Sequence, residues 1–588
     1  MKNEYGPSLP ISEEIHAMKY RGPNETFHEA MSRVADALKD DPHHYEQFRD
    51  ILLNQRFLPA GRVQSAMGSP REVTPYNCFV SENIEDSMKG IMKAAENAAQ
   101  TMRLGGGIGY DFSTLRPKGA LIKSLDSRSS GPISFMGIFD AVCKTIASAG
   151  HRRGAQMGVL RVDHPDIEEF IRAKNNSTDL TGFNISVGVT DKFMHAVKED
   201  QNFDLVFKGR VYKTIRAKAL WDDILRSTWD WAEPGILFID KINRKNNLWY
   251  IERINATNPC GEQPLPPNGA CLLGSFNLTQ YVFKDKDGFW AFDYEKFRHD
   301  IPFVVRAMDN VVDRAVYPLV EQQKEAENKR RMGLGLTGVA NAIEALGYPY
   351  GTHGFLNILR RIMETLRDTA YQTSISLAIE KGSFPLFNKN YLQSEFAQTL
   401  PDGIRADIAQ HGIRNSHLLS IAPTGTISLS ADNVSSGIEP VFSLYYDRTI
   451  QTFEGERTER VEDYGYREFG VEGRTADELS VFDHVKVLNL ASQYVDSACS
   501  KTCNVGDEVT WEDFKRVYMD AYDGGSSGCT TFRASGKRYG ILNAATSEDI
   551  AEEPEKQLDL FNDEMVDPET VNGGACYYDP QTGQRSCE

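Results

Sequence analysis

The chain lacks long apolar runs, and nowhere in its 588 residues do about 20 apolar residues follow one another, the length that a membrane-spanning helix needs. Its first residues, MKNEYGPSLP, lack the apolar core of a secretory signal. These two absences argue against a membrane-spanning protein and against a secreted one. We therefore expect a cytoplasmic protein with no membrane partner.

Cysteine is scarce as well, with nine in the whole chain, and the number is odd. A secreted disulfide scaffold of this length would need more cysteines and an even count. Basic residues are also in deficit, with 65 Lys and Arg against 83 Asp and Glu, which gives a net charge of -18. This balance disfavours broad binding to a nucleic-acid backbone, so we expect no nucleic-acid partner.

What the chain does contain is typical of a globular protein, with 40% hydrophobic and 25% charged residues. Residues 1–55 read as polar helical material. From 56 to 545, short β-rich runs alternate with helical patterns and Gly-rich turns, which predicts an α/β fold. The strand-like segments are 182–190, 271–278 and 418–429.

The end of the chain has a different composition. Between positions 548 and 569 there are ten acidic residues and one lysine. Such a segment repels itself and has little apolar mass, so we expect residues 546–588 to form a flexible tail. Cys576 and Cys587 lie at the far end of this tail, which suggests a mobile redox pair.

One helix is predicted between Met88 and Met102, because apolar residues recur there at spacings of three and four. The stripe consists of Met88, Ile91, Met92, Ala95, Ala98, Ala99 and Met102. A helix packed on the core explains this pattern, and a helix–helix dimer interface is the alternative.

The densest group of reactive side chains lies in a proline-rich loop that starts at Asn258. Its four prolines exclude a regular helix and a central strand. Asn258, Cys260 and Glu262 occupy alternate positions, so an extended loop would present them on one face. An amide, a thiol and a carboxylate side by side indicate a catalytic site rather than a simple turn.

This Asn-x-Cys-x-Glu loop, followed by a second cysteine at position 271, resembles the active-site finger loop of ribonucleotide reductase large subunits. Further segments resemble the family's motifs in the family's order, namely residues 55–62, 77–80, 105–119, 152–157, 161–167, 333–338 and 422–428. Each Gly-rich piece alone would be weak, but the set is specific.

The resemblance implies a ten-stranded α/β barrel, built from two five-stranded halves, with the finger loop inside. It also implies reduction of the ribose 2′-hydroxyl of ribonucleotides. Cys260 would carry the thiyl radical that abstracts the 3′ hydrogen, and Glu262 would be the base at the 3′-hydroxyl. Asn258 would orient the substrate hydroxyls. Cys78 and Cys271 would donate two electrons and end each turnover as a disulfide.

The same resemblance implies the remaining substrate contacts and the source of electrons. The substrate-binding residues would be Asn77, Thr424, Gly425, Thr426, Ile427 and Ser428. Cys576 and Cys587 would reduce the internal disulfide and would then be reduced by a thioredoxin- or glutaredoxin-like protein. Many members carry a closer pair of tail cysteines than this chain does.

The radical source is indicated by residues 528–533, Gly-Cys-Thr-Thr-Phe-Arg, which resemble the adenosylcobalamin-dependent class. Thr531 and Phe532 stand where the metal-dependent class has a tandem tyrosine. A large subunit that needs a ferritin-like partner is the first alternative, and a nucleotide-binding regulator without turnover is the second. Dimeric relatives favour diphosphates over triphosphates as the substrates.

Regulation follows from the resemblance too. A deoxynucleotide or ATP effector would bind at the interface of a homodimer, beside Asp86, Ser87, Met88 and Lys123. Too few residues precede the barrel motifs for the family's ATP-binding cone, so we expect no shut-off by dATP. The remaining cysteines, at 143, 499, 503 and 529, are interpreted as structural, and no metal site is predicted.

Overall fold

A computed structural model describes residues 5–122, 126–148, 152–153, 156–175, 178–452, 455–533, 535–536, 576–578 and 585–587. Three helices open the chain, as predicted: α1 (Pro10–Tyr20), α2 (Phe27–Leu38) and α3 (Pro42–Leu53). Thr26 and Glu29 form a reciprocal cap at the start of α2. Pro42 occupies the first position of α3, where its missing amide hydrogen costs nothing.

The largest sheet has eight strands in the order β15-β2-β3-β8-β9-β12-β23-β22. Their bounds are β15 (Ala270–Cys271), β2 (Cys78–Val80), β3 (Gly107–Asp111), β8 (Gln156–Arg161), β9 (Phe183–Val189), β12 (Gly235–Phe238), β23 (Gly528–Phe532) and β22 (Thr502–Asn504). The strands from β2 to β12 run parallel, whereas β15 and β23 pair antiparallel with their neighbours β2 and β12. Strand β9 confirms the prediction for 182–190.

A second sheet has the order β1-β16-β19, with β1 (Phe57–Pro59), β16 (Leu273–Asn277) and β19 (Gly333–Thr337). Only Leu272 separates β15 of the first sheet from β16 of the second. Two single bridges, Leu334 to Leu419 and Ile421 to Cys499, extend the second sheet toward the segment that enters β22. The prediction of strand structure for 271–278 is therefore confirmed.

One sequence-based expectation about the fold stays a prediction, and another needs correction. The α/β class is confirmed, and since the described strands form mixed sheets, the closed ten-stranded barrel stays a prediction. The strand expected at 418–429 was wrong, because that segment makes only single bridges and ends in the short helix α17 (Gly425–Leu429). Pro423 lacks an amide hydrogen and Thr424 has a φ of 56°, so neither residue can continue a strand.

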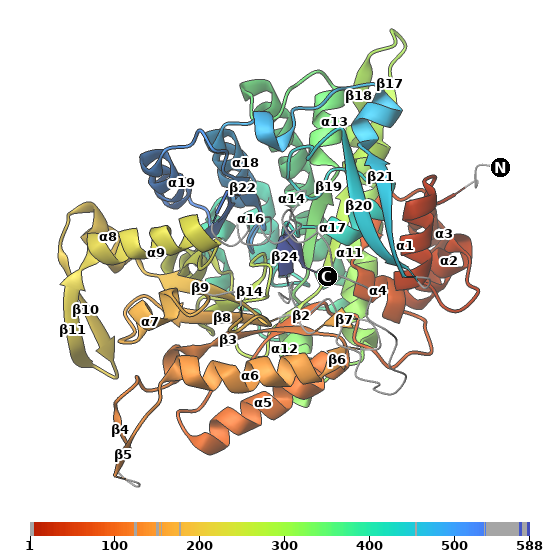
Figure 1. Ribbon diagram of the computed structural model, residues 1–588. Helices are drawn as coiled ribbons and strands as arrows, with labels where there is room; N and C mark the ends of the chain where they lie inside the picture. Colours follow the sequence, from red (N-terminus) through yellow and green to blue (C-terminus); the bar gives the residue numbers. More distant parts are fainter. Residues whose placement is uncertain are drawn as a thin grey trace, which may run out of the picture.

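Helices surround the sheets (Figure 1). Helices α5 (Met88–Arg103) and α6 (Pro132–Thr145) pack together below the large sheet, and α9 (Ala217–Trp231) lies against β23. The long helices α11 (Tyr294–Arg314) and α14 (His353–Lys381) pack on one another beside the second sheet. None of the helices in the described ranges has the length and apolar character needed to cross a membrane.

The two faces of the large sheet belong to different parts of the core. Ile185 and Val187 of β9 pack in a cluster with the outer helices. Met157 of β8 and Cys271 of β15 belong to a second cluster, which also includes the second sheet and helices α11 and α14. The space between the two sheets is thus filled, and it includes Ala256 and Leu265, which flank the proline-rich loop.

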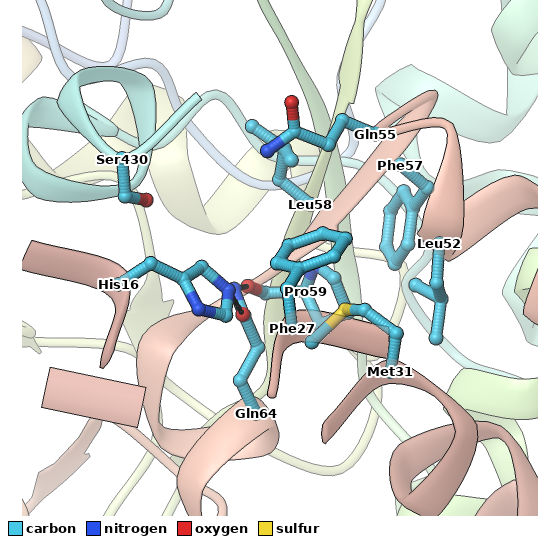
Figure 2. Close-up of a pocket in the computed structure, with 10 residues that line it drawn as sticks. All are labelled: His16, Phe27, Met31, Leu52, Gln55, Phe57, Leu58, Pro59, Gln64 and Ser430. Carbon is cyan, nitrogen blue, oxygen red and sulfur yellow. Dashed lines mark hydrogen bonds between the residues drawn. The ribbon is translucent and has the colours of Figure 1, made fainter. Parts of the chain in front are cut away.

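A small cavity lies where the N-terminal helices meet α4 (Gly61–Ala66), and Figure 2 shows the side chains that line it. Its volume of about 10 Å³ has room for one water molecule. The His16 ring lies 2.9 Å from Gln64 Oε1 and accepts a hydrogen bond of 3.0 Å from Arg21 at its other nitrogen. These contacts hold α1 against α4.

Candidate active site

The finger loop is the tip of a small hairpin. Strand β13 (Ala256–Thr257) pairs antiparallel with β14 (Pro264–Leu265), and residues 258–263 form the turn. Asn258 closes this turn through two hydrogen bonds to Gln263. The backbone N–H of Asn258 donates to the Gln263 carbonyl at 3.2 Å, and Asn258 Oδ1 accepts from the backbone N–H of Gln263 at 2.9 Å. These two bonds hold the two ends of the turn together.

The predicted reacting side chains on this tip are all buried. Asn258 is 0% exposed, Cys260 7% and Glu262 1%. Among the described residues, Asn258 Nδ2, Gln263 Nε2 and Asn77 Oδ1 are buried without a hydrogen-bond partner. Since buried polar atoms are nearly always paired, these donors and this acceptor fit a polar ligand such as a nucleoside.

Cys78 and Cys271 lie directly opposite one another on the paired strands β2 and β15. Burial, followed by the nearby Glu262, Cys78 and Cys260 groups, raises the pKa of Cys271 well above its ordinary value. The fold therefore brings the three predicted active-site thiols and the predicted base into one buried cluster. Facing positions on paired strands suit the formation of a disulfide.

Two glycines give the finger loop its room. A side chain on Gly109 of β3 would collide with the Thr257 carbonyl. A side chain on Gly333 of β19 would collide with Nε2 of the Gln263 side chain. Both glycines belong to the Gly-rich motifs of the sequence. In this fold these two make space for the finger loop at opposite ends of its turn.

The segment predicted to bind phosphate forms α17 and the residue before it. The hydroxyl groups of Thr424 and Ser428 bond to each other at 3.0 Å and to Thr337 at 2.9 and 2.7 Å. Both hydroxyls are buried, whereas Gly425, Thr426 and Ile427 are half-exposed. Backbone amides in the first turn of α17, rather than these two hydroxyls, are thus the groups available to an anion.

Sequence reasoning missed the residues opposite this turn. A pocket of about 20 Å³ beside Gly425 is also lined by Ser435 and Ser436. The next residue, Gly437, donates its amide to Thr424 Oγ1 at 2.7 Å. The sequence could have indicated these residues only through the run Ser435-Ser436-Gly437, and such runs are common in loops.

The tail cysteines lie on two short strands, β24 (Cys576–Tyr578) and β25 (Arg585–Cys587). The strands pair antiparallel, and Cys576 faces Cys587 in the register. Strand β25 contacts α17, and β24 lies near the centre of the molecule in Figure 1. The register of these two strands thus pairs two cysteines that are eleven positions apart in the sequence.

The predicted effector residues lie at the start of α5. Asp86 pairs with Arg116 at 3.0 Å and with Lys208 at 3.1 Å, and Ser87 caps the helix by accepting from Gly90 at 3.0 Å. Met88 is 60% exposed. Lys123 lies outside the described residues. The structure therefore locates three of the four predicted effector residues.

The apolar stripe of α5 divides between two environments. Ile91, Ala95, Ala98 and Met102 are buried in the core, whereas Met88 and Met92 are 60% and 49% exposed. The core interpretation is right for most of the stripe. The two exposed methionines form a small apolar patch on the outer side of the helix.

Of the remaining cysteines, Cys499 lies beside the finger loop, because it follows Ala498, whose amide donates to the Glu262 carbonyl at 3.0 Å. Cys143 is buried on α6, which agrees with its interpretation as a core residue. Cys503 and Cys529 are buried on the neighbouring strands β22 and β23, and the hydrogen bond between the Cys529 thiol and Cys503, followed by burial, raises the pKa of Cys529 well above its ordinary value. The described residues contain no cluster of His, Cys, Asp and Glu suited to a metal ion.

Comparison with known proteins agrees with this geometry. Residues 76–532 match the family model for the ribonucleotide reductase barrel domain. The chain is 34% identical to a vitamin B12-dependent ribonucleoside-diphosphate reductase of Thermoplasma acidophilum, over 91% of this chain and 71% of that protein. It is 33% identical to the enzyme of the same name from Mycobacterium tuberculosis, over 90% and 79%.

A more distant similarity links the chain to a different group. It is 27% identical to a ribonucleoside-diphosphate reductase large subunit of Caenorhabditis elegans, over 64% of this chain and 52% of that protein. The barrel-domain match covers most of the chain and includes the finger loop and both facing cysteines. The chain belongs to the ribonucleotide reductase family.

Proposed function

We propose that this protein reduces ribonucleoside diphosphates to 2′-deoxyribonucleoside diphosphates by thiyl-radical chemistry dependent on adenosylcobalamin. The observation that carries the proposal is the buried cluster of Cys260 and Glu262 beside the facing pair Cys78 and Cys271. The names of the similar proteins from Thermoplasma acidophilum and Mycobacterium tuberculosis support the cofactor and the diphosphate substrate.

In this proposal each member of the cluster has one task. The Cys260 radical takes a hydrogen atom from C3′, and Glu262 accepts the proton of the 3′-hydroxyl. Asn258, whose Nδ2 lacks a partner among the described residues, donates to a substrate hydroxyl, and Asn77 Oδ1 accepts from one. Cys78 and Cys271 give up two electrons and two protons as their thiols become a disulfide.

The phosphates of the substrate would bind at the first turn of α17. We assign them to the segment Thr424, Gly425, Thr426, Ile427 and Ser428, with backbone amides as the donors. The buried hydroxyls of Thr424 and Ser428 would hold the turn in shape through Thr337. Ser435 and Ser436 would line the same pocket.

Adenosylcobalamin would bind beside strand β23. The strand reads Gly-Cys-Thr-Thr-Phe and has no tyrosine that could pass on a radical, and Thr531 bonds to the Tyr518 hydroxyl at 2.8 Å. Gly528 and Thr530 form its half-exposed face and would hold the cofactor. When bound, adenosylcobalamin supplies a carbon-centred radical from its cobalt–carbon bond.

The proposed protein is a closed barrel that forms a homodimer. The link at Leu272 and the bridge between Ile421 and Cys499 support a closed ten-stranded barrel. A homodimer would form through the exposed face of α5, with the deoxynucleotide or ATP effector beside Asp86, Ser87, Met88 and Lys123.

Electrons would come from outside the barrel. Cys576 and Cys587 would pass them to the internal disulfide from a thioredoxin- or glutaredoxin-like protein in the cytoplasm, and the contact between β25 and α17 supports this route. The tail would then act from a position close to the substrate site.

The test is an assay of the purified chain with adenosylcobalamin, a ribonucleoside diphosphate and dithiothreitol. We expect the deoxynucleoside diphosphate as product, with no second protein. Product that forms only after addition of a ferritin-like metalloprotein would replace this proposal with a two-subunit reductase. Triphosphate reduction without diphosphate reduction would correct the substrate.

A further inference from the structure

Two buried side chains outside the predicted catalytic set hold the backbone of the finger loop on either side of Cys260. Asn184 Nδ2 donates to the Pro259 carbonyl at 3.2 Å. Ser420 Oγ donates to the Glu262 carbonyl at 2.8 Å, and the Ala498 amide donates to the same carbonyl at 3.0 Å. Asn184 is 8% exposed and Ser420 0%.

The Asn184 contact follows from the register of the large sheet. Gly109 of β3 pairs with Met157 of β8, and Met157 pairs with Asn184 of β9, so the three residues form one row on the inner face. Adjacent strands lie about 4.8 Å apart, which makes the row about 10 Å long. The finger loop crosses it, with Thr257 packed on Gly109 and the Pro259 carbonyl bonded to Asn184.

The Ser420 contact comes from the other side of the fold. Ser420 lies between Leu419 and Ile421, whose single bridges join β19 to the segment at Cys499. Its own amide donates to the Leu334 carbonyl at 3.0 Å, so its position is fixed by the second sheet. Asn184 and Ser420 therefore hold residues 259 and 262 from the two opposite sheets.

We propose that Asn184 and Ser420 are positioning residues that set the location of the Cys260 sulfur and the Glu262 carboxylate relative to the ribose. This inference rests on the proposed function. Hydrogen-atom transfer breaks the C3′–H bond and forms the S–H bond, so its rate depends steeply on the distance between carbon and sulfur. A displacement of about 1 Å can lower a rate by about a hundredfold. Neither residue touches the reacting atoms.

The variants are Asn184→Asp, which keeps the shape but removes the donor, and Ser420→Ala. We expect kcat to fall by about tenfold to a hundredfold while KM for the nucleotide changes by less than about threefold. The isotope effect with 3′-deuterated nucleotide should rise above the wild-type value, because hydrogen abstraction becomes slower than the other steps.

The control is Ser227→Ala. Ser227 lies on α9, and its buried hydroxyl oxygen lies 3.0 Å from the carbonyl oxygens of both Ile171 and Glu233. Its loss should lower thermal stability and leave the isotope effect at the wild-type value, because a smaller folded fraction does not change the chemistry of the molecules that remain folded.

The outcomes separate the two proposals. An inactive wild-type protein would overturn the proposed function. An active wild-type protein whose Asn184→Asp and Ser420→Ala variants keep the wild-type kcat and isotope effect would overturn the positioning role. A lower kcat with an unchanged isotope effect would assign both residues to stability alone.

Discussion

Burial changes the chemistry of individual side chains throughout this molecule. In the active-site cluster it raises the pKa of the Cys271 thiol, which is therefore protonated at neutral pH. A protonated thiol can deliver both its hydrogen and an electron, as reduction of the substrate requires. At the N-terminal cavity, burial lowers the pKa of His16, and this shift makes the stability of the fold depend on pH.

Burial and the Arg21 guanidinium lower the pKa of His16 from 6.5 to about 3. The folded protein therefore keeps His16 neutral at pH values where the unfolded chain binds a proton. Its contribution to stability is complete above pH 6.5 and is lost as the pH falls toward about 3. The expected slope is about 1.4 kcal/mol per pH unit.

The check is denaturant unfolding of the wild type and His16→Asn at about pH 7 and about pH 5.5. The wild type should lose about 1.3 kcal/mol more than the variant over this interval, because the full slope applies only below pH 6.5. His411→Asn changes an exposed histidine on α16 (Asp402–His411) and should behave as the wild type. Equal losses in the wild type and His16→Asn would show that His16 is not buried as described.

Among the elements, the finger hairpin depends on its neighbours more than on its own sequence. Its two strands are only two residues long, and Gly109 of β3 gives it the space to pass. Such a short hairpin is not stable alone. Its shape is therefore set by the sheets on either side.

Gly109→Ala should displace the hairpin, because the new Cβ would overlap the Thr257 carbonyl. We expect loss of most deoxynucleotide formation together with a lower thermal midpoint. Gly403→Ala is the matched control, since a Cβ at that position on α16 meets no atom within 4 Å and alanine favours helix. Wild-type activity in Gly109→Ala would rule out this role for the glycine.

The tail hairpin gives a second prediction at the scale of elements. Reduced protein without an external reductant should make about two deoxynucleotides per chain, one from each dithiol pair. The double variant Cys576→Ser, Cys587→Ser should make about one, and Cys143→Ala should still make about two. The measurement is the number of deoxynucleotides formed per chain in a rapid-quench experiment. Two deoxynucleotides per chain from the tail variant would exclude the tail as an electron donor.

Elements with local signals could be predicted from the sequence. The helix α5 follows from the spacing of three and four residues between its apolar side chains. The alternate placement of Asn258, Cys260 and Glu262 likewise identified the candidate site. The β-rich composition of 418–429 was misleading, because the left-handed backbone at Thr424 ends the extended run.

Other parts of the site depend on tertiary contacts and had no sequence signal. Asn184 lies in a buried strand that contains one other polar residue, Ser186, and nothing local indicates that it meets Pro259, which is 75 positions away. Ser420 meets Glu262 across a separation of 158 positions. Such pairs become visible only when both sheets are in place.

For the whole molecule, the exposed patch on α5 bears on assembly. Met88 and Met92 are 60% and 49% exposed although they continue a stripe that is otherwise packed in the core. Continuity with that stripe favours a second copy of the chain as the partner that covers them. Binding of the effector near Asp86 would then depend on the dimer.

Met92→Glu should weaken the dimer, because a charge would be buried at the interface. Sedimentation velocity at low micromolar concentration should show monomer for this variant and dimer for the wild type. Ile379→Glu, at a 63% exposed site on α14, serves as the control and should remain dimeric. A dimeric Met92→Glu variant would place the interface elsewhere.

The central claim is that Cys260 carries the radical that starts the reaction, and Cys260→Ala tests it most directly. With adenosylcobalamin, a ribonucleoside diphosphate and dithiothreitol, this variant should form no deoxynucleotide above background. It should bind the nucleotide as the wild type does, because Asn258, Asn77 and α17 are unchanged. Cys503→Ala, which changes a buried cysteine on β22, should remain active. Turnover by Cys260→Ala would contradict the account.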